Sequence, residues 1–318
     1  MRRALVLLTL AFPIAHGLAA QGTGTTAGIL LEVPATPRAL ALGGAYAAVV
    51  GDEGSVFVNP AGLAPIHRVA FGVSQERAFF GSTLSTGAGA VRIGRFHLGL
   101  GLVYLDLGSD SVIVPDPAFG GDRGVATGAL FSAYNMLAVG ALAYRRGLLS
   151  AGTSVKYLRE HIDGGGAGDW TASGVAVDLG IAAALFDIAA LGLVVQNLGG
   201  DLRATGTAPA PLPRTTRLGF TLNFIDPQGT SRLMATTDWV SPPGGDSYWA
   251  IGLEGGVVSG GVGVVGRAGF AAGRAPSDRQ DLSYGGGLVF HSIRVDYAFQ
   301  GYAVTGIESH RIGVRLLR

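Results

Sequence analysis

The 318-residue sequence contains no cysteine, and only 14% of its residues are charged, against roughly a quarter in an ordinary soluble domain. The absence of cysteine excludes disulfides, thiolate zinc sites and cysteine nucleophiles. Basic and acidic residues nearly cancel, with a formal net charge of +1, and Lys156 is the only lysine. No basic excess is present to neutralise a phosphate backbone, so nucleic acid is not an expected partner.

Long hydrophobic runs are also scarce. Residues 1–20 combine Arg2 and Arg3 with an apolar stretch that ends in small residues. This pattern predicts a secretory signal peptide and does not fix the exact bond that is cleaved. The alternative, a membrane anchor, needs about 20 apolar residues, and this stretch is shorter. Residues 179–195 are interrupted by Asp187 and follow an alternating segment, so we interpret them as strands rather than as a helix.

Alternation with a period of two recurs along the chain. Leu218, Phe220 and Leu222, for example, alternate with Gly219 and Thr221, which gives one apolar face and one small or polar face. The pattern predicts fourteen strands, at residues 68–75, 82–93, 95–107, 124–145, 148–160, 170–185, 187–197, 213–225, 230–240, 246–258, 261–272, 281–290, 292–300 and 306–317.

The connections between these strands fall into two sets. Those after even-numbered strands are tight, whereas the longest, at residues 108–123, 161–169 and 198–212, all follow odd-numbered strands. Short turns on one rim and long loops on the other are typical of transmembrane barrels with periplasmic termini. A soluble sandwich has no reason to separate its loops in this way. The sequence therefore predicts an all-β protein, a fourteen-stranded antiparallel transmembrane β-barrel over residues 67–318, in the outer membrane of a bacterium.

Residues 21–66 show no sustained alternation and are rich in Gly, Ala and Pro. Many of the 53 glycines fall on the inward face of the predicted strands, where small residues leave room for bulk inside the cylinder. We therefore predict that residues 21–66 form an N-terminal hatch, or plug, in the lumen. The alternative is a disordered periplasmic arm.

Within this segment, residues 38–64 (RALALGGAYAAVVGDEGSVFVNPAGLA) resemble the N-terminal signature of the PorV/PorQ family, which is related to the FadL long-chain fatty acid channels. Residues 154–160, 175–182, 194–200 and 295–316 are similar to the mid-barrel and closing strands of that group. The chain departs from the pattern in being shorter than typical FadL channels and in ending at Arg318 rather than at an aromatic residue. The signature residues are Gly43, Gly44, Tyr46, Asp52, Glu53, Asn59, Pro60, Ala61 and Gly62.

The resemblance implies a fourteen-stranded barrel with an N-terminal hatch and no enzymatic activity. PorV and PorQ act in type IX secretion, where they bind or shuttle exported proteins at the cell surface, and we expect an accessory role of that kind. The alternative is a FadL-like passive transporter of hydrophobic small molecules. The expected partners are accordingly outer-membrane lipid, exported proteins or secretion components, or a hydrophobic small ligand, with the barrel a monomer.

Charged residues on the predicted inward face form the first candidate site. We interpret them as a structural ion-pair network; the alternative is a charged conduit for an anionic head group. Lys156 and Asp178 lie on neighbouring predicted strands. The residues are Lys156, Asp178, Arg217, Asp238, Glu254, Arg267, Arg294, Asp296, Arg311 and Arg315.

Apolar and aromatic residues near the longest predicted loop form the second candidate site, a rim surface for docking a partner protein. These residues are Val112, Ile113, Val114, Phe119, Phe131 and Tyr134.

Signals for an enzyme are weak. The run Gly261-x-Gly263-x-x-Gly266 matches the dinucleotide fingerprint in letters, but valines place it inside a predicted strand, with no helix following. The histidines lack metal-ligand spacing, and the aspartates near residues 106–122 lack a dense calcium loop. The sequence therefore predicts no catalytic residue, no cofactor and no metal.

Overall fold

The computed structural model describes residues 26–77, 81–165, 168–185, 188–225, 230–272, 279–302 and 308–318. The predicted signal peptide, residues 1–20, lies outside these ranges. No helix within them is long and apolar enough to cross a membrane.

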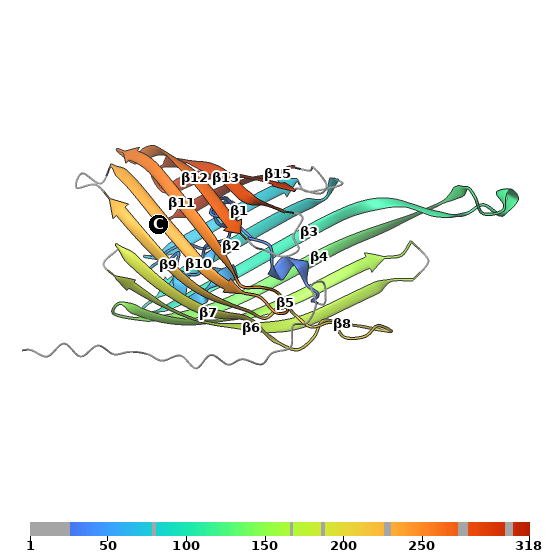
Figure 1. Cartoon of the computed structure of the whole chain (residues 1–318), viewed down its shortest axis with the longest axis horizontal. Helices are drawn as coiled ribbons and strands as arrows, with labels where there is room; N and C mark the ends of the chain where they lie inside the picture. Colours follow the sequence, from blue (N-terminus) through green and yellow to red (C-terminus); the bar gives the residue numbers. More distant parts are fainter. Residues whose placement is uncertain are drawn as a thin grey trace, which may run out of the picture.

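The chain forms a closed barrel of antiparallel strands (Figure 1). Each strand pairs with its neighbours in the chain, and β1 pairs with β15 to close the cylinder. The two-residue β8 (Arg203–Ala204) lies beside β6 and leaves fourteen strands in the wall. These are β1 Val69–Arg77, β2 Thr83–Ile93, β3 Phe96–Pro115, β4 Gly124–Arg146, β5 Leu149–Asp163, β6 Trp170–Leu185, β7 Ala189–Gly199, β9 Thr215–Ile225, β10 Ser231–Ser241, β11 Tyr248–Ser259, β12 Val262–Ala272, β13 Arg279–Phe290, β14 Ile293–Tyr302 and β15 Glu308–Leu317.

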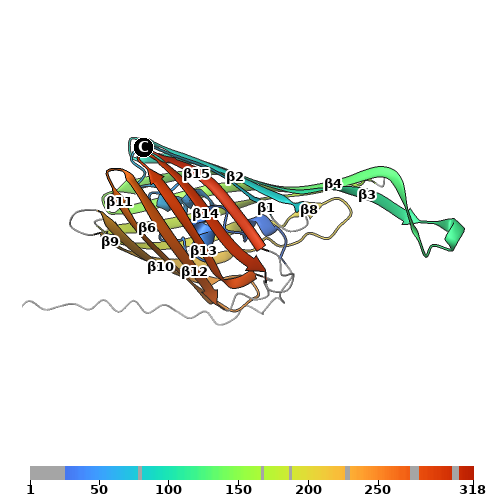
Figure 2. The same ribbon diagram turned by 90° about the horizontal axis from the view of Figure 1, so that it is seen from above.

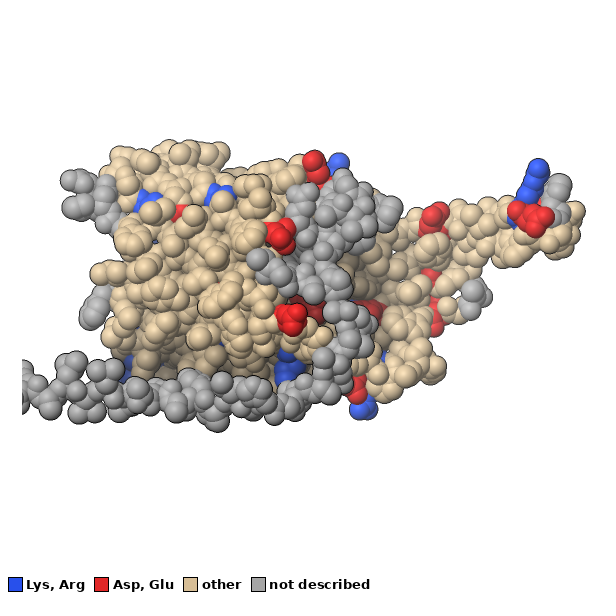
Figure 3. All heavy atoms as spheres, in the orientation of Figure 1, with Lys and Arg blue, Asp and Glu red and all other residues tan. Residues whose placement is uncertain are grey.

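Exposure alternates along the wall strands as the sequence pattern predicts. On β3, Leu98, Leu100 and Leu102 are exposed, whereas His97 and Val103 are buried. On the face drawn in Figure 3, charged side chains gather toward the two ends of the barrel and on the projection beyond it. An apolar band on the outside of a closed antiparallel barrel is the surface that faces lipid. The predicted fold class is confirmed.

The loop predicted at residues 108–123 is wrong over its first half, residues 108–115. β3 continues to Pro115 and β4 starts at Gly124, so the two strands form a hairpin that projects beyond the barrel (Figures 1 and 2). β2 stops pairing with β3 at Asp106, and β5 stops pairing with β4 at Ser132. We call residues 107–131 the arm. Its two strands satisfy each other's backbone hydrogen bonds, so they persist without the rest of the wall.

Residues 26–66, which we call the hatch segment, lie inside the barrel (Figure 2). They form four short helices: η1 (Ile29–Leu31), α1 (Pro37–Ala41), α2 (Ser55–Val58) and η2 (Pro60–Leu63). Thr36 caps α1 by accepting a hydrogen bond from the Ala39 amide, and Pro37 occupies the first turn.

Glycines of the wall bring the hatch segment into direct contact with the strand backbones. A Cβ atom at Gly101 would lie 2.6 Å from a ring carbon of Phe57, and one at Gly269 would lie 2.0 Å from the backbone nitrogen of Gly43. Real Cβ atoms do not approach this closely, so the lumen is shaped to the hatch segment by the absence of side chains. Wall glycines in such contact are Gly72, Gly99, Gly101, Gly152, Gly180, Gly192, Gly219, Gly252, Gly269, Gly285 and Gly313.

Candidate lumen site

The glycine and asparagine positions of the hatch signature set its backbone path. Gly43 and Gly44 have φ angles of 66° and 79°, the left-handed region that ends α1. Asn59 caps η2 by accepting from the Ala61 amide at 3.1 Å, and its Nδ2 donates to the Ala47 carbonyl at 2.8 Å. Pro60, Ala61 and Gly62 then lie in η2. The Asn59 side chain therefore ties two stretches of the hatch segment together.

Tyr46 and its neighbours contact the wall through Asp238 of β10. Asp238 Oδ2 accepts hydrogen bonds from the backbone amides of Tyr46 and Ala47, each at 2.9 Å. Arg217 of β9 donates to the Gly44 carbonyl at 3.0 Å and lies 3.8 Å from Asp238. Two wall charges thus hold the chain just after α1 by its backbone.

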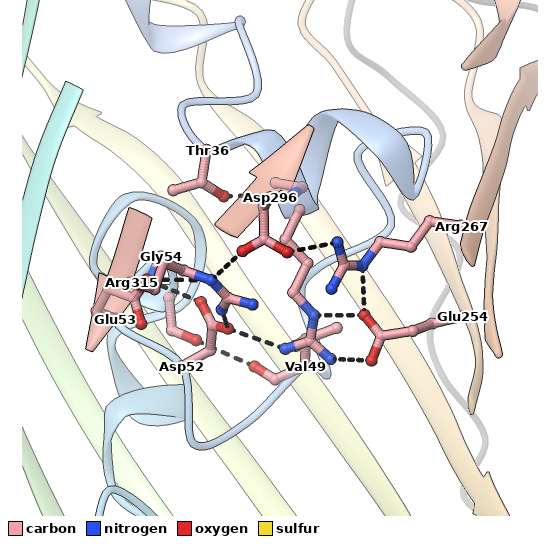
Figure 4. A network of polar contacts seen from close by, with 12 residues as sticks. Thr36, Val49, Asp52, Glu53, Gly54, Glu254, Arg267, Asp296 and Arg315 are labelled. Atoms are coloured by element: carbon pink, nitrogen blue, oxygen red, sulfur yellow. Dashed lines mark hydrogen bonds and ion pairs between the residues drawn. The ribbon is translucent and has the colours of Figure 1, made fainter. Parts of the chain in front are cut away.

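Two hatch residues, Arg38 and Asp52, form ion pairs with Glu254 of β11 and Arg315 of β15 (Figure 4). Arg38 Nε and Nη2 donate to the two carboxylate oxygens of Glu254 at 2.8 and 2.9 Å. Arg38 Nη1 also lies 2.9 Å from Asp52 Oδ2, the same oxygen that Arg315 Nη1 contacts. Bidentate pairing fixes the orientation of the guanidinium as well as its position.

The wall residues of this group continue the chain of contacts. Glu254 of β11 lies 2.6 Å from Arg267 of β12, Arg267 lies 2.6 Å from Asp296 of β14, and Asp296 lies 2.6 Å from Arg315 of β15. Arg38, Asp52 and these four residues therefore form a closed ring in which positive and negative side chains alternate (Figure 4). We call it the six-charge ring.

Glu53 lies beside the ring and is 1% exposed. Its Oε1 atom is 3.8 Å from Arg315 Nε, and neither carboxylate oxygen has a hydrogen-bond partner among the described residues. Burial raises the pKa of Glu53 to about 7, repulsion from Asp52 adds to the increase, and Arg315 opposes it. Burial would also raise the pKa of Asp52, but Arg315 and Arg38 outweigh it and hold that pKa well below its usual range.

The remaining inward charges form separate groups on the wall. Lys156 lies 2.8 Å from Asp178, which also accepts hydrogen bonds from Ser154 Oγ and the Asn197 amide. Arg311 pairs with Glu76 and donates to the Pro34 carbonyl.

Arg294 lies opposite Arg315 in the register of β14 and β15 and is half-buried. The structure thus brings the predicted lumen charges together in several clusters rather than in one network.

Four residues that contribute to these contacts were missed from the sequence. Glu76 pairs with Arg311, and His97 Nε2 lies 3.1 Å from the carbonyl oxygen of Ile66. Both residues face inward by strand alternation, and that signal was sufficient to find them. Gln196 of β7 donates to the Val58 carbonyl at 2.9 Å. Arg38 is the one cation among the described hatch residues, and a lone charge within an apolar stretch is itself a signal of a buried partner.

A small cavity lies between the hatch segment and the wall. Its lining is mixed: Leu31, Val33 and Phe57 contribute apolar side chains, and polar edges come from Glu32, Lys156, Gln196 and Arg217. The cavity volume is about 30 Å³, room for a water molecule or two, whereas about 150 Å³ accommodates a benzene ring. An aromatic ligand therefore does not fit in this conformation.

The predicted rim residues lie on the arm or at its base. Val112, Ile113 and Val114 are on β3, and Ile113 is 65% exposed. Phe131 is exposed on β4, and Tyr134 stacks on Tyr104 at the arm's base, with ring centroids 5.4 Å apart.

Phe119 ends η4 (Pro117–Phe119) at the arm's tip, and its side chain lies outside the described part of the structure. The glycine run beginning at Gly261 lies in the turn before β12 and in β12 itself, not between a strand and a helix. Among the described residues, no group of three or more His, Asp or Glu side chains is placed to hold a metal ion.

A closed fourteen-stranded barrel with an apolar outer band is the architecture of a transmembrane barrel, and it fits a bacterial outer membrane. No family model matches the sequence, and a search of the curated proteins finds no match to it. Solved structures match the fold.

The CymD monoaromatic hydrocarbon channel is 15% identical with a TM-score of 0.61, covering 90% of this chain and 98% of that one. A Pseudomonas aeruginosa FadL homologue is 13% identical with a TM-score of 0.55, covering 89% and 98%. The Ralstonia pickettii toluene transporter TbuX is 14% identical with a TM-score of 0.54, covering 88% and 96%. At these identities the likeness shows a shared fold.

Proposed function

We propose that this protein is a passive outer-membrane channel for hydrophobic small molecules, closed in this conformation by the hatch segment. The observation that carries the proposal is the cavity between the hatch segment and the wall, to which Leu31, Val33 and Phe57 contribute apolar side chains. Apolar walls bind a hydrophobic ligand by removing it from water. The likeness to a monoaromatic hydrocarbon channel and to a toluene transporter supports this function over protein docking.

The cavity must enlarge for transport, because about 30 Å³ does not hold an aromatic ring. The wall strands are paired along their length, whereas the hatch segment is held by side-chain contacts and short helices. Movement of the hatch segment is therefore the route to a larger cavity. The polar edges do not oppose an apolar ligand, since Lys156 already pairs with Asp178 and Arg217 with Gln196.

The proposed orientation places the short turns and the C-terminal end in the periplasm and the arm outside the cell. Ala27 lies at the arm's end of the barrel, where its amide donates to the Pro211 carbonyl in the connection between β7 and β9. The start of β1 and the end of β15 meet on the periplasmic side, where the Arg68 amide donates to the Arg318 carbonyl. Long extracellular loops and short periplasmic turns are the usual arrangement of such barrels.

Uptake of radiolabelled toluene by cells that make the protein tests the proposal. We expect faster uptake than in cells without it, and no change for a sugar of similar size. Val33→Phe, which fills the cavity, should reduce toluene uptake, whereas Val69→Phe, the same change at an exposed wall position, should not. Equal toluene uptake with and without the protein would contradict the channel.

A second candidate function, docking of an exported protein as in the PorV/PorQ family, is favoured by one observation. The arm projects past the barrel and exposes Ile113, Val125 and Leu130 to solvent. Replacing residues 108–131 with a two-residue Asn-Gly turn retains the wall pairing of β2 with β3 and of β4 with β5. Loss of a co-purifying exported protein, with toluene uptake unchanged, would support docking.

A further inference from the structure

The six-charge ring has a property that follows from its order. The hatch segment contributes two adjacent members, Arg38 and Asp52, which pair with each other. The wall contributes four members in series, from Glu254 on β11 to Arg315 on β15. Only two contacts join the two parts: Arg38 with Glu254, and Asp52 with Arg315.

We propose that the six-charge ring is a releasable latch, from which the hatch segment separates while every ring member keeps an oppositely charged partner. After separation Arg38 stays with Asp52, Glu254 with Arg267, and Arg315 with Asp296. Removing the only partner of a buried charge is strongly unfavourable, and the alternating order avoids that cost. The inference rests on the proposed function in one respect, that the hatch segment moves.

The other charged wall residues that contact the hatch segment follow the same rule. Arg311 donates to the Pro34 carbonyl but pairs with Glu76 inside the wall. Asp238 accepts two hatch amides but has Arg217 on the neighbouring strand. The wall is therefore charge-balanced in these groups without the hatch segment, as a second, open state requires.

The opposite side of the hatch segment is held differently. Val56, Phe57, Leu63 and Ile66 belong to a large apolar cluster with residues of β2 to β6. Polar contacts there involve neutral groups, such as Ser150 Oγ with the Ala61 carbonyl. Water entering the lumen weakens ion pairs by raising the local dielectric constant, whereas it does not weaken apolar packing in the same way. Separation should thus begin on the β11–β15 side.

The absence of cysteine allows single-cysteine reporters. Ser283 on β13 and Ser55 in the hatch segment are both 0% exposed, and Ser→Cys is close to isosteric. The experiment measures labelling of Ser283→Cys and of Ser55→Cys by a charged maleimide in isolated outer membranes without ligand. We expect faster labelling at Ser283→Cys, on the latch side, than at Ser55→Cys, in the interior of the hatch segment, where the Ser55 hydroxyl donates to the Val49 carbonyl.

Two ring variants should then shift the Ser283→Cys rate in opposite directions. Arg38→Gln with Asp52→Asn removes both hatch members, so labelling should accelerate by about tenfold. Asp296→Asn leaves Arg315 with ion-pair partners only in the hatch segment, Asp52 and Glu53. Separation would strand that cation, so labelling should slow severalfold. A merely structural network would loosen, and label faster, in both variants.

Acceleration by Asp296→Asn comparable to that of the double variant would overturn the latch. If the double variant does not assemble, Arg267→Gln replaces it as a second test: Glu254 would then depend on Arg38, and labelling must again fall below the parent rate. If the labelling rates follow the predicted order but the protein does not take up toluene, the latch is retained and the channel function is refuted. If the protein takes up toluene but the labelling rates do not follow that order, the channel function is retained and the latch is refuted.

Discussion

The Lys156 ammonium nitrogen lies 2.8 Å from Asp178 Oδ2 across the β5–β6 pair, and both side chains are almost fully buried. Lys156 also donates to Asn197 Oδ1 at 3.0 Å, and Ser154 Oγ donates to Asp178 at 3.0 Å. Both charges are therefore paired and further hydrogen-bonded inside the wall, as a buried ion pair requires.

Breaking this pair from one side should be costly. Lys156→Met leaves Asp178 buried without its cation, and we expect a loss of about 3–5 kcal/mol in stability. Adding Asp178→Asn should recover much of the loss, because no uncompensated charge remains. The temperature at which the folded, fast-migrating gel band disappears measures both variants, and a double variant no more stable than Lys156→Met would contradict the pairing argument.

Substitution by arginine should have different effects at two exposed aliphatic positions of β3, because only one of them is expected to contact lipid. Leu100 in the wall is 72% exposed and Ile113 on the arm is 65% exposed. Leu100→Arg should cost about 2–4 kcal/mol if its surroundings are hydrocarbon, and Ile113→Arg should cost little in water. Unfolding in detergent-free bilayers measures the difference. Equal costs would mean that the wall does not face lipid at Leu100.

Thr221→Arg, which strand alternation offers as a harmless inward control, is unsuitable. Thr221 is 2% exposed and its hydroxyl lies 2.8 Å from that of Thr236. An arginine there would meet a filled lumen.

Removal of the hatch segment should open the barrel without unfolding it. The lumen charges pair within the wall, so deleting residues 22–66 should leave an assembled barrel that conducts ions in a planar bilayer. The parent protein should hardly conduct. Asn59→Ala with Pro60→Ala should give smaller, fluctuating currents, since the cap of η2 is lost. An assembled but closed deletion variant would refute the plug.

Glu53 should make the hold on the hatch segment weaker at high pH. Its pKa is raised from 4.5 to about 7, so between these values the folded protein binds a proton that the unfolded chain does not. The free energy of unfolding therefore falls as pH rises through this window, and Glu53 destabilises the folded protein most above pH 7. The charged groups facing Glu53 are Asp52, Arg315 and Arg38.

Thermal midpoints at pH 5 and pH 8 test this dependence. Glu53→Gln cannot ionise, so it should reduce the difference between the two midpoints and raise the midpoint at pH 8. Asp52→Asn, a neighbouring acid whose pKa is lowered, provides the contrasting control. An unchanged pH dependence in Glu53→Gln would assign the titration to another group.

Strand alternation was enough to predict the wall. Residues such as Leu218 and Phe220 against Gly219 and Thr221 set two faces, and each of the fourteen predicted strands overlaps an observed one. Pairing also follows chain order, so no long-range choice of partner was needed beyond the closure of β1 on β15.

The arm was missed because Gly108, Asp110 and Gly120–Gly121 carry turn-forming signals. The β3–β4 register is irregular after Asp106 and again after Ser111, and these irregularities accommodate Gly108 and Asp110 within the hairpin. A bulge absorbs an extra residue without ending the ladder, which a scan for turn residues does not detect.

The sequence by itself determined the barrel, the inward face of its strands and the position of most lumen charges, because a period of two is a local property of each strand. Only the tertiary structure decided which charges meet. Arg38 and Glu254 are 216 positions apart, and their bidentate contact depends on how the hatch segment lies inside the closed wall. Ion pairing needs side chains within a few ångströms of each other, and that proximity arises only when the cylinder closes around the hatch segment.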